Sequence, residues 1–168
     1  MLPPLLPEKE KYIIINKGPG TMERWQYMKE KDTNDLTQEL MSQASLTSYI
    51  KENSPYFSDL SIAELLNALY EHKSLSKAAL ARKAGMSEVY LHQVFSGRRN
   101  PSRDRLICLC VGLSASLEET QRLLKQAGYA QLYTKNKRDA IISYGILHQN
   151  ELAEINDNLF AQNEKTLF

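Results

Sequence analysis

The chain has 168 residues, of which 42% are hydrophobic and 24% charged, with two cysteines and a formal net charge of +1. The apolar fraction excludes a wholly disordered chain, two cysteines exclude a disulfide framework, and no apolar run approaches the roughly 20 residues of a membrane-spanning helix. The composition therefore predicts a globular cytoplasmic protein with one domain, or with one small domain and flanking segments.

The N-terminal part of the sequence gives weak structural signals. Residues 1–35 are rich in Pro and Gly and show no clear hydrophobic period, so we expect a largely irregular N-terminal arm. Within the arm, Tyr12–Ile15 could form one short strand, although no partner strand is evident. Residues 36–60 are expected to form a short helix and a linker. The proline at position 55 predicts that this helix ends near Glu52.

From residue 61 onward, capping residues and apolar stripes alternate regularly and predict a series of helices. No segment shows a sustained two-residue alternation, so the predicted fold class is all-α. We expect a five-helix domain over residues 61–128 and extra C-terminal helices over residues 129–168. Gly145 lies inside one of these C-terminal helices and counts against it. The predicted helix N-caps are Ser61, Ser76, Ser87, Ser102, Ser116 and Asn136.

The segment Leu75–Gly97 predicts two short helices joined by a tight turn, which is the helix-turn-helix arrangement. Ala81 is small enough to let the two helices cross closely. Gly85 permits the sharp reversal because glycine adopts positive φ at no steric cost, and Met86 fills the angle between the helices. Ser87 caps the second helix, whose positive N-terminal end is a favourable place for a phosphate.

Positive charge is concentrated around this motif. Residues 73–105 contain eight basic and two acidic side chains and so carry a charge of +6. Residues 1–72 contain seven basic and eleven acidic side chains, and residues 106–168 contain six and seven. A basic cluster of this size is the electrostatic footprint expected for a polyanionic partner. The alternative is chance clustering of charges on a solvated face.

The motif and its surroundings resemble a known family. Residues Leu75–Leu106, LSKAALARKAGMSEVYLHQVFSGRRNPSRDRL, resemble the lambda-repressor-like, Cro-type helix-turn-helix family of bacterial and phage transcriptional regulators. They depart from the common pattern at Lys77, where many members have Gln, and at Phe95, where many have Glu. The resemblance implies a lambda-repressor-like domain whose recognition helix, Glu88–Ser96, lies in the major groove of double-stranded DNA, with a homodimer as the expected assembly.

The resemblance also implies which side chains contact DNA. Base reading is expected from three outward residues of the recognition helix: Gln93 to adenine, Val89 to a thymine methyl group, and Glu88 to cytosine N4. Glu88 could instead repel phosphates. Contacts with the DNA backbone, which give affinity and register without sequence information, are expected from Lys77, Ser87, Tyr90, His92, Arg98, Arg99 and Arg103.

A second function remains open, because helix-turn-helix geometry also occurs in modules that bind proteins. In that case the chain would be a protein-interaction module or adaptor, and the acidic N-terminal third or the C-terminal helices would dock a signalling or toxin-type partner. The apolar stripes between Ile141 and Phe160 are the candidate dimer or partner surface. They are equally expected to pack on the helix-turn-helix core.

Neither catalysis nor a metal or other cofactor is expected. Cys108 and Cys110 lie two residues apart on a predicted helix, about 200° around its axis, and neither has a neighbouring His, so they are expected to fill helix packing. The three His residues show no metal-binding spacing, and the Gly18–Gly20 stretch lacks the Lys-Ser/Thr continuation of a phosphate-binding loop.

Overall fold

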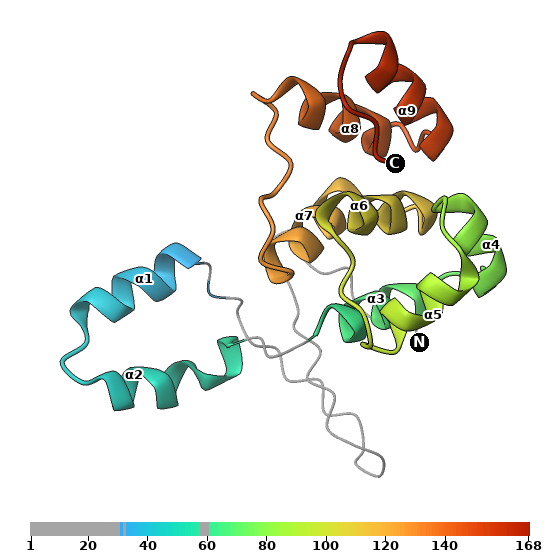
Figure 1. The fold of residues 1–168 in the computed structure, drawn as a ribbon. Helices are drawn as coiled ribbons and strands as arrows, with labels where there is room; N and C mark the ends of the chain where they lie inside the picture. Colours follow the sequence, from blue (N-terminus) through green and yellow to red (C-terminus); the bar gives the residue numbers. More distant parts are fainter. Residues whose placement is uncertain (1–30, 32, 58–60) are drawn as a thin grey trace, which may run out of the picture. The chain divides into compact units, whose positions relative to one another are not determined.

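Figure 1 shows the computed structural model, which describes residues 31, 33–57 and 61–168. All the elements assigned in these residues are helices, so the all-α prediction is confirmed for this part of the chain. The structure divides into two compact units, Met1–Ser58 and Asp59–Phe168. Most of the expected irregular arm, including the strand considered at Tyr12–Ile15, lies outside the described residues.

The first unit contains a helical hairpin in place of the single helix expected after residue 36. It consists of α1 (Thr33–Ser42), α2 (Leu46–Asn53) and a 3₁₀ turn, η1 (Ser54–Tyr56). The break occurs at Ser45, whose backbone is extended and whose side chain accepts a hydrogen bond from the Ser48 N–H, so that a new helix begins. Among the described residues of this unit only Tyr49 and Asn53 are buried.

The described residues of the second unit, 61–168, form seven helices, and the six predicted N-caps are confirmed. Ser61 and Ser116 form capping boxes with Glu64 and Glu119, and the other four predicted caps each accept a hydrogen bond from a backbone N–H at the start of a helix. The helices are α3 (Ile62–Glu71), α4 (Lys77–Lys83), α5 (Glu88–Phe95), α6 (Arg103–Gly112), α7 (Leu117–Gln126), α8 (Lys137–Leu147) and α9 (Leu152–Ala161).

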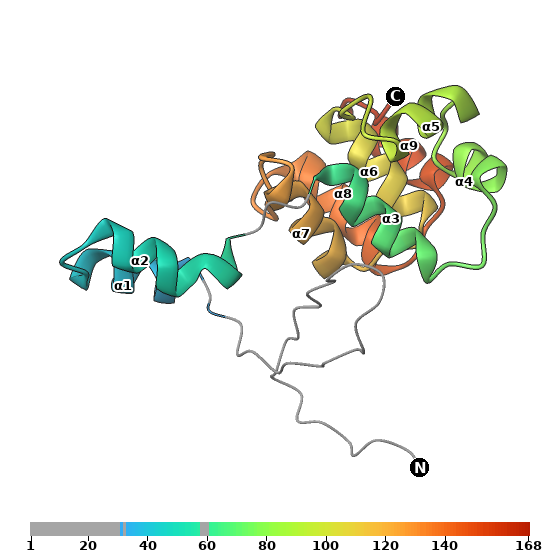
Figure 2. The ribbon, with the colours of Figure 1, turned by 90° about the horizontal axis from the view of Figure 1, so that it is seen from below.

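The helix α6 lies at the centre of this unit. It packs against α4, α7 and α9, and in Figure 2 it lies among the other helices. Leu106, Leu109, Cys110 and Leu113 have the spacing of one inward face, yet Ile107 is buried as well, and so is Cys108, as the sequence predicts. A helix that is covered on all sides shows no amphipathic stripe, so its apolar spacing marks only part of its buried surface.

The C-terminal helices α8 and α9 belong to the same core. Ile142 and Ile155 are fully buried in it, so the apolar stripes do pack on the helix-turn-helix core, whereas Tyr144 and Phe160 remain exposed. Gly145 allows α8 and α9 to approach closely, because a Cβ at this position would lie 2.4 Å from the Cγ1 of Ile155. The glycine that counts against a helix in the sequence is therefore required by tertiary packing.

Candidate nucleic-acid interface

The turn between α4 and α5 has the geometry that the sequence predicts. Gly85 has φ of +60°, and its N–H donates to the carbonyl of Arg82 while the N–H of Met86 donates to the carbonyl of Ala81. This pair of bonds ends α4 and turns the chain sharply. The carbonyl of Gly85 accepts a hydrogen bond from Arg105 Nη1 at 3.0 Å, which ties the turn to α6.

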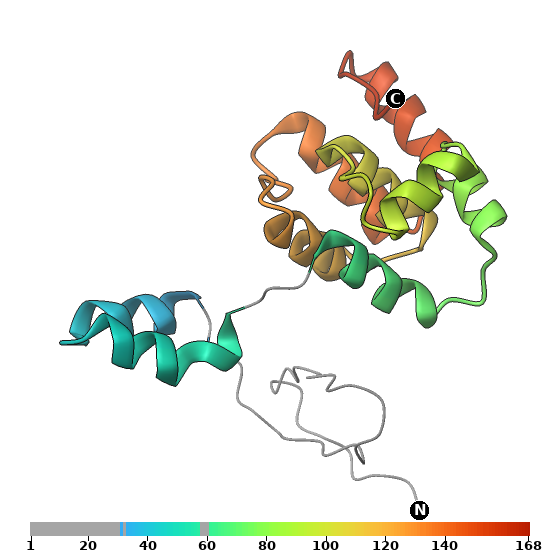
Figure 3. The ribbon, with the colours of Figure 1, turned by 60° about the horizontal axis from the view of Figure 1, so that its bottom comes forward.

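The helix α5 is held in place from both ends. At its start, the Ser87 hydroxyl accepts a hydrogen bond from the Tyr90 N–H at 3.2 Å. At its end, Asn67 of α3 donates its side-chain amide to the Phe95 carbonyl at 2.9 Å. The side chains of Leu91 and Phe95 are buried against the core. These contacts fix the orientation of α5, which lies on the outside of the unit (Figure 3).

The outward face of α5 carries the predicted base-reading residues. Glu88 and His92 are exposed, and 69% of Val89 is accessible to solvent. Tyr90 and Gln93 are half-buried. An exposed valine at the start of a short helix, next to polar side chains, gives this face both an apolar contact and hydrogen-bonding groups. Such a combination suits the edges of base pairs in a major groove.

The two arginines after α5 are exposed to solvent. Arg98 and Arg99 lie in the turn that follows Gly97. The Arg99 guanidinium lies 4.8 Å from the centre of the Tyr90 ring, so the aromatic ring supports one side of the cation. The Arg99 cation therefore lies beside α5, and Arg98 directly precedes it in the chain.

Two other predicted backbone-binding residues have contacts within the protein. The Nζ atom of Lys77 lies 3.2 Å from the ring centre of Phe95 and 4.4 Å from that of Tyr70, and burial lowers the pKa of Lys77. Arg103 donates to the Ala130 carbonyl at 2.8 Å and to Asp139 at 2.9 Å. A DNA contact at either residue stays a prediction, and each cation also has a structural role.

A comparison with protein families also indicates a helix-turn-helix in this part of the chain. Residues 61–123 match the family model described as a helix-turn-helix domain. These residues are therefore similar to a helix-turn-helix domain. The matched span contains α3 to α6 and most of α7, and includes the whole outward face of α5. The match supports a DNA-binding regulator in general and does not distinguish the Cro-type subfamily. The comparisons with curated proteins and with solved structures gave no match.

Two ion pairs that the sequence does not predict link α6 to α8. Arg103 of α6 pairs with Asp139 of α8 at 2.9 Å, and Arg138 of α8 pairs with Asp104 of α6 at 3.0 Å. Each helix begins with the same Arg-Asp dipeptide, at its first or second residue. That repeat was the available signal, although it does not by itself reveal which residues pair.

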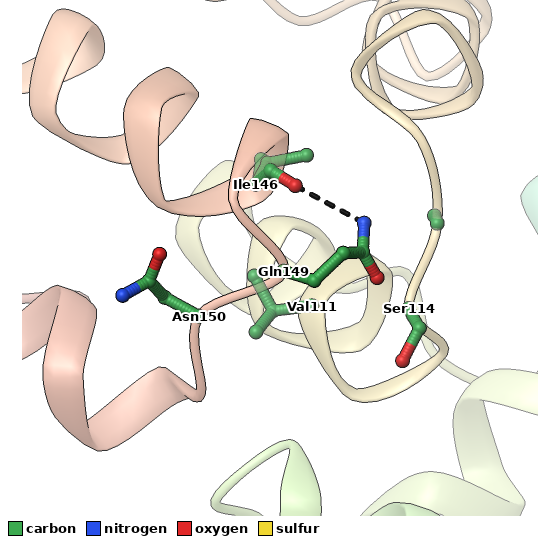
Figure 4. A pocket seen from close by; sticks show the side chains of 6 residues that line it. Val111, Ser114, Ile146, Gln149 and Asn150 are labelled. Atoms are coloured by element: carbon green, nitrogen blue, oxygen red, sulfur yellow. Dashed lines mark hydrogen bonds between the residues drawn. The ribbon is translucent and has the colours of Figure 1, made fainter.

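Away from α5 and the turn that follows it, the described residues include one small pocket and two buried thiols. A pocket of about 20 Å³ between α6 and the end of α8 has room for about one water molecule and is lined by Ser114, Gln149 and Asn150, among others (Figure 4). Burial raises the pKa of Cys108 to about 11 and that of Cys110 to about 12, which makes both thiols poor nucleophiles.

No group of three or more His, Cys, Asp or Glu side chains is placed to hold a metal ion within the part of the chain that the structure describes. No helix in the described ranges is both long and apolar enough to cross a membrane.

Proposed function

We propose that this chain is a sequence-specific DNA-binding transcriptional regulator that places α5 in the major groove of double-stranded DNA. The observation that carries the proposal is the outward face of α5, where Glu88 and Val89 are exposed while the opposite face is buried. The caps and turn that fix α5 make this face a rigid surface. Rigidity favours readout because little conformational entropy is lost when the helix binds.

The roles of the side chains follow from their chemistry. Val89 contacts a thymine methyl group, Gln93 pairs with adenine, and Glu88 accepts a hydrogen bond from cytosine N4. Arg98 and Arg99 neutralise phosphates beside the groove. Ser87, Tyr90 and His92 contact the DNA backbone and help to position the protein on the duplex. Lys77 and Arg103 are further candidates for such contacts.

A single domain of this kind reads few base pairs, so we propose that the chain acts as a homodimer. Two-fold symmetry would place two α5 helices in successive major grooves about 34 Å apart. The target would then be a palindrome with half-sites about one helical turn apart. Each half-site would contribute the same set of contacts, which doubles the binding free energy available for discrimination.

Selection of bound sequences from random DNA tests this proposal with the full chain. We expect enrichment of a palindrome whose half-sites are about 10 base pairs apart, centre to centre. The double variant Arg98→Ala/Arg99→Ala should bind the selected site far more weakly. Recovery of unenriched sequence from the unmodified protein would contradict sequence-specific binding.

A protein-interaction module or adaptor is the second candidate, and one observation favours it. A groove of about 460 Å³ lies between α8 and α9, lined by Ile141, Tyr144 and Ala161 among others. Tyr144 of this lining is 58% accessible to solvent, and Phe160 of α9 is 78% accessible. A signalling or toxin-type partner would bury these rings. A stoichiometric partner in a pull-down, together with no retardation of DNA at low salt, would favour this function over DNA binding.

A further inference from the structure

The segment between α7 and α8 is fastened to the start of α6. The Tyr129 hydroxyl donates to the Pro101 carbonyl at 2.7 Å. Arg103 donates from Nε to the Ala130 carbonyl at 2.8 Å and from Nη2 to the Gln131 carbonyl at 3.3 Å. Pro101 and Arg103 directly follow the turn that contains Arg98 and Arg99. The segment is therefore held beside the chain that leaves the proposed DNA-binding turn (Figure 3).

Further hydrogen bonds make the same segment rigid. The side-chain amide of Gln121 pairs with the backbone of Leu132 in both directions, each bond being 2.7 Å long. The Tyr133 N–H donates to Asp139 Oδ2 at 3.1 Å. Leu132 itself is buried in the core. A connection with this many fixed backbone groups presents its exposed side chains from a defined position.

Those exposed side chains are hydrogen-bond donors. Thr134 and Lys135 are exposed, and 59% of Tyr133 is accessible to solvent. Two hydroxyl groups and one ammonium group therefore face water within three consecutive residues. Such a set suits phosphate oxygens and offers little to an apolar protein surface.

The local charge also favours an anion. Asp139, which accepts the Tyr133 N–H of the segment, and Asp104 of α6 are each paired with an arginine, so their negative charge is compensated. Lys135 and Lys137 then add positive charge that these carboxylates do not cancel. The Nζ atom of Lys137 donates to a neutral acceptor, the Gln162 carbonyl, at 2.8 Å, so both lysines contribute positive charge at this edge of the unit.

We propose that Tyr133, Thr134 and Lys135 form a second contact with the DNA backbone. This contact binds phosphates that flank those reached by Arg98 and Arg99. The inference rests on the proposed function, because it requires α5 to face DNA. It extends the footprint of each protomer beyond the bases that α5 reads. The added contact contributes affinity and register, and it is independent of sequence.

The salt dependence of non-specific binding tests the second contact without knowledge of the target sequence. The probe is a labelled DNA duplex of random sequence, titrated with the full chain between about 50 and 200 mM salt. Lys135→Gln should lower the slope of log K against log salt by about 1 per protomer and weaken binding about five- to ten-fold near 0.1 M salt. Lys51→Gln, an equal charge change at an exposed lysine of α2, is the matched control and should leave the slope unchanged.

The outcomes separate this inference from the proposed function. If Arg98→Gln lowers the slope and Lys135→Gln does not, the second contact is wrong and DNA binding by the turn stands. If the unmodified protein shows no binding at low salt, both proposals fail. If Lys135→Gln alters the oligomeric state in sedimentation but leaves the slope unchanged, the segment contacts protein, which also overturns the inference.

Discussion

Arg98 and Arg99 differ from Arg103 and Arg105 in environment, although all four come from one short basic stretch of the sequence. The first two are exposed in the turn after α5. The second two lie at the start of α6 and donate to acceptors within the protein, Arg103 to Asp139 and Arg105 to the Gly85 carbonyl. The basic stretch with a charge of +6 therefore includes two kinds of arginine: those exposed to solvent and those that bond to acceptors within the protein.

The difference has an energetic consequence. A partly buried ion pair that also satisfies backbone carbonyls is costly to break, because the remaining carboxylate is left in a poorly solvated place. An exposed arginine contributes little to the stability of the folded state. We therefore expect Arg98 and Arg99 to affect ligand binding, and Arg103 and Arg105 to affect the stability of the fold. Mutation should distinguish these two effects.

The largest expected effect is on stability at Arg103. We expect Arg103→Met to lower the free energy of unfolding by about 3 kcal/mol, because Asp139 loses its cation and the carbonyls of Ala130 and Gln131 lose their donor. Urea denaturation followed by circular dichroism measures the change. Arg98→Met removes the same charged group from an exposed position and should alter the free energy of unfolding by less than about 0.5 kcal/mol. If both variants lost the same free energy of unfolding, the proposed difference between Arg103 and Arg98 would be wrong.

The exposed pair should show the opposite behaviour. Arg98→Ala/Arg99→Ala should leave the urea midpoint almost unchanged and weaken DNA binding on the order of fifty-fold near 0.1 M salt. The slope of log K against log salt should fall by about 2 per protomer, since two phosphate contacts are lost. Fluorescence anisotropy with a labelled duplex measures both quantities. An unchanged slope would show that these arginines do not contact phosphates.

The local elements of the fold could be predicted from the sequence. Ser61, Ser87 and Ser116 begin helices because each cap bonds a backbone N–H within three residues, so the signal and its partner lie in the same short stretch. The reversal at Gly85 is equally local, since positive φ depends on that residue alone. The helix-turn-helix geometry was therefore visible before any tertiary contact was known.

The roles of individual cations could not be predicted, because their partners are distant in the sequence. Arg103 meets Asp139 across 36 positions, and Lys77 meets the ring of Phe95 only after α4 and α5 have packed. Gly145 is a similar case, because a larger residue there would clash with the side chain of Ile155 on another helix. Sequence patterns describe periodicity along one helix, whereas these contacts depend on how several helices pack.

Lys77 tests the difference between DNA-binding and structural cations, and its expected effect is the smallest. It is the first residue of α4, the first helix of the helix-turn-helix motif, and it contacts Tyr70 and Phe95. We expect Lys77→Met to lower the free energy of unfolding by about 1 kcal/mol, the size of a partly desolvated cation–π contact, and to leave the salt slope of DNA binding unchanged. Lys77→Arg keeps a cation over the rings and should restore most of the lost stability. If Lys77→Met instead lowers the slope by about 1 with no loss of stability, the ammonium binds phosphate and belongs with Arg98 and Arg99.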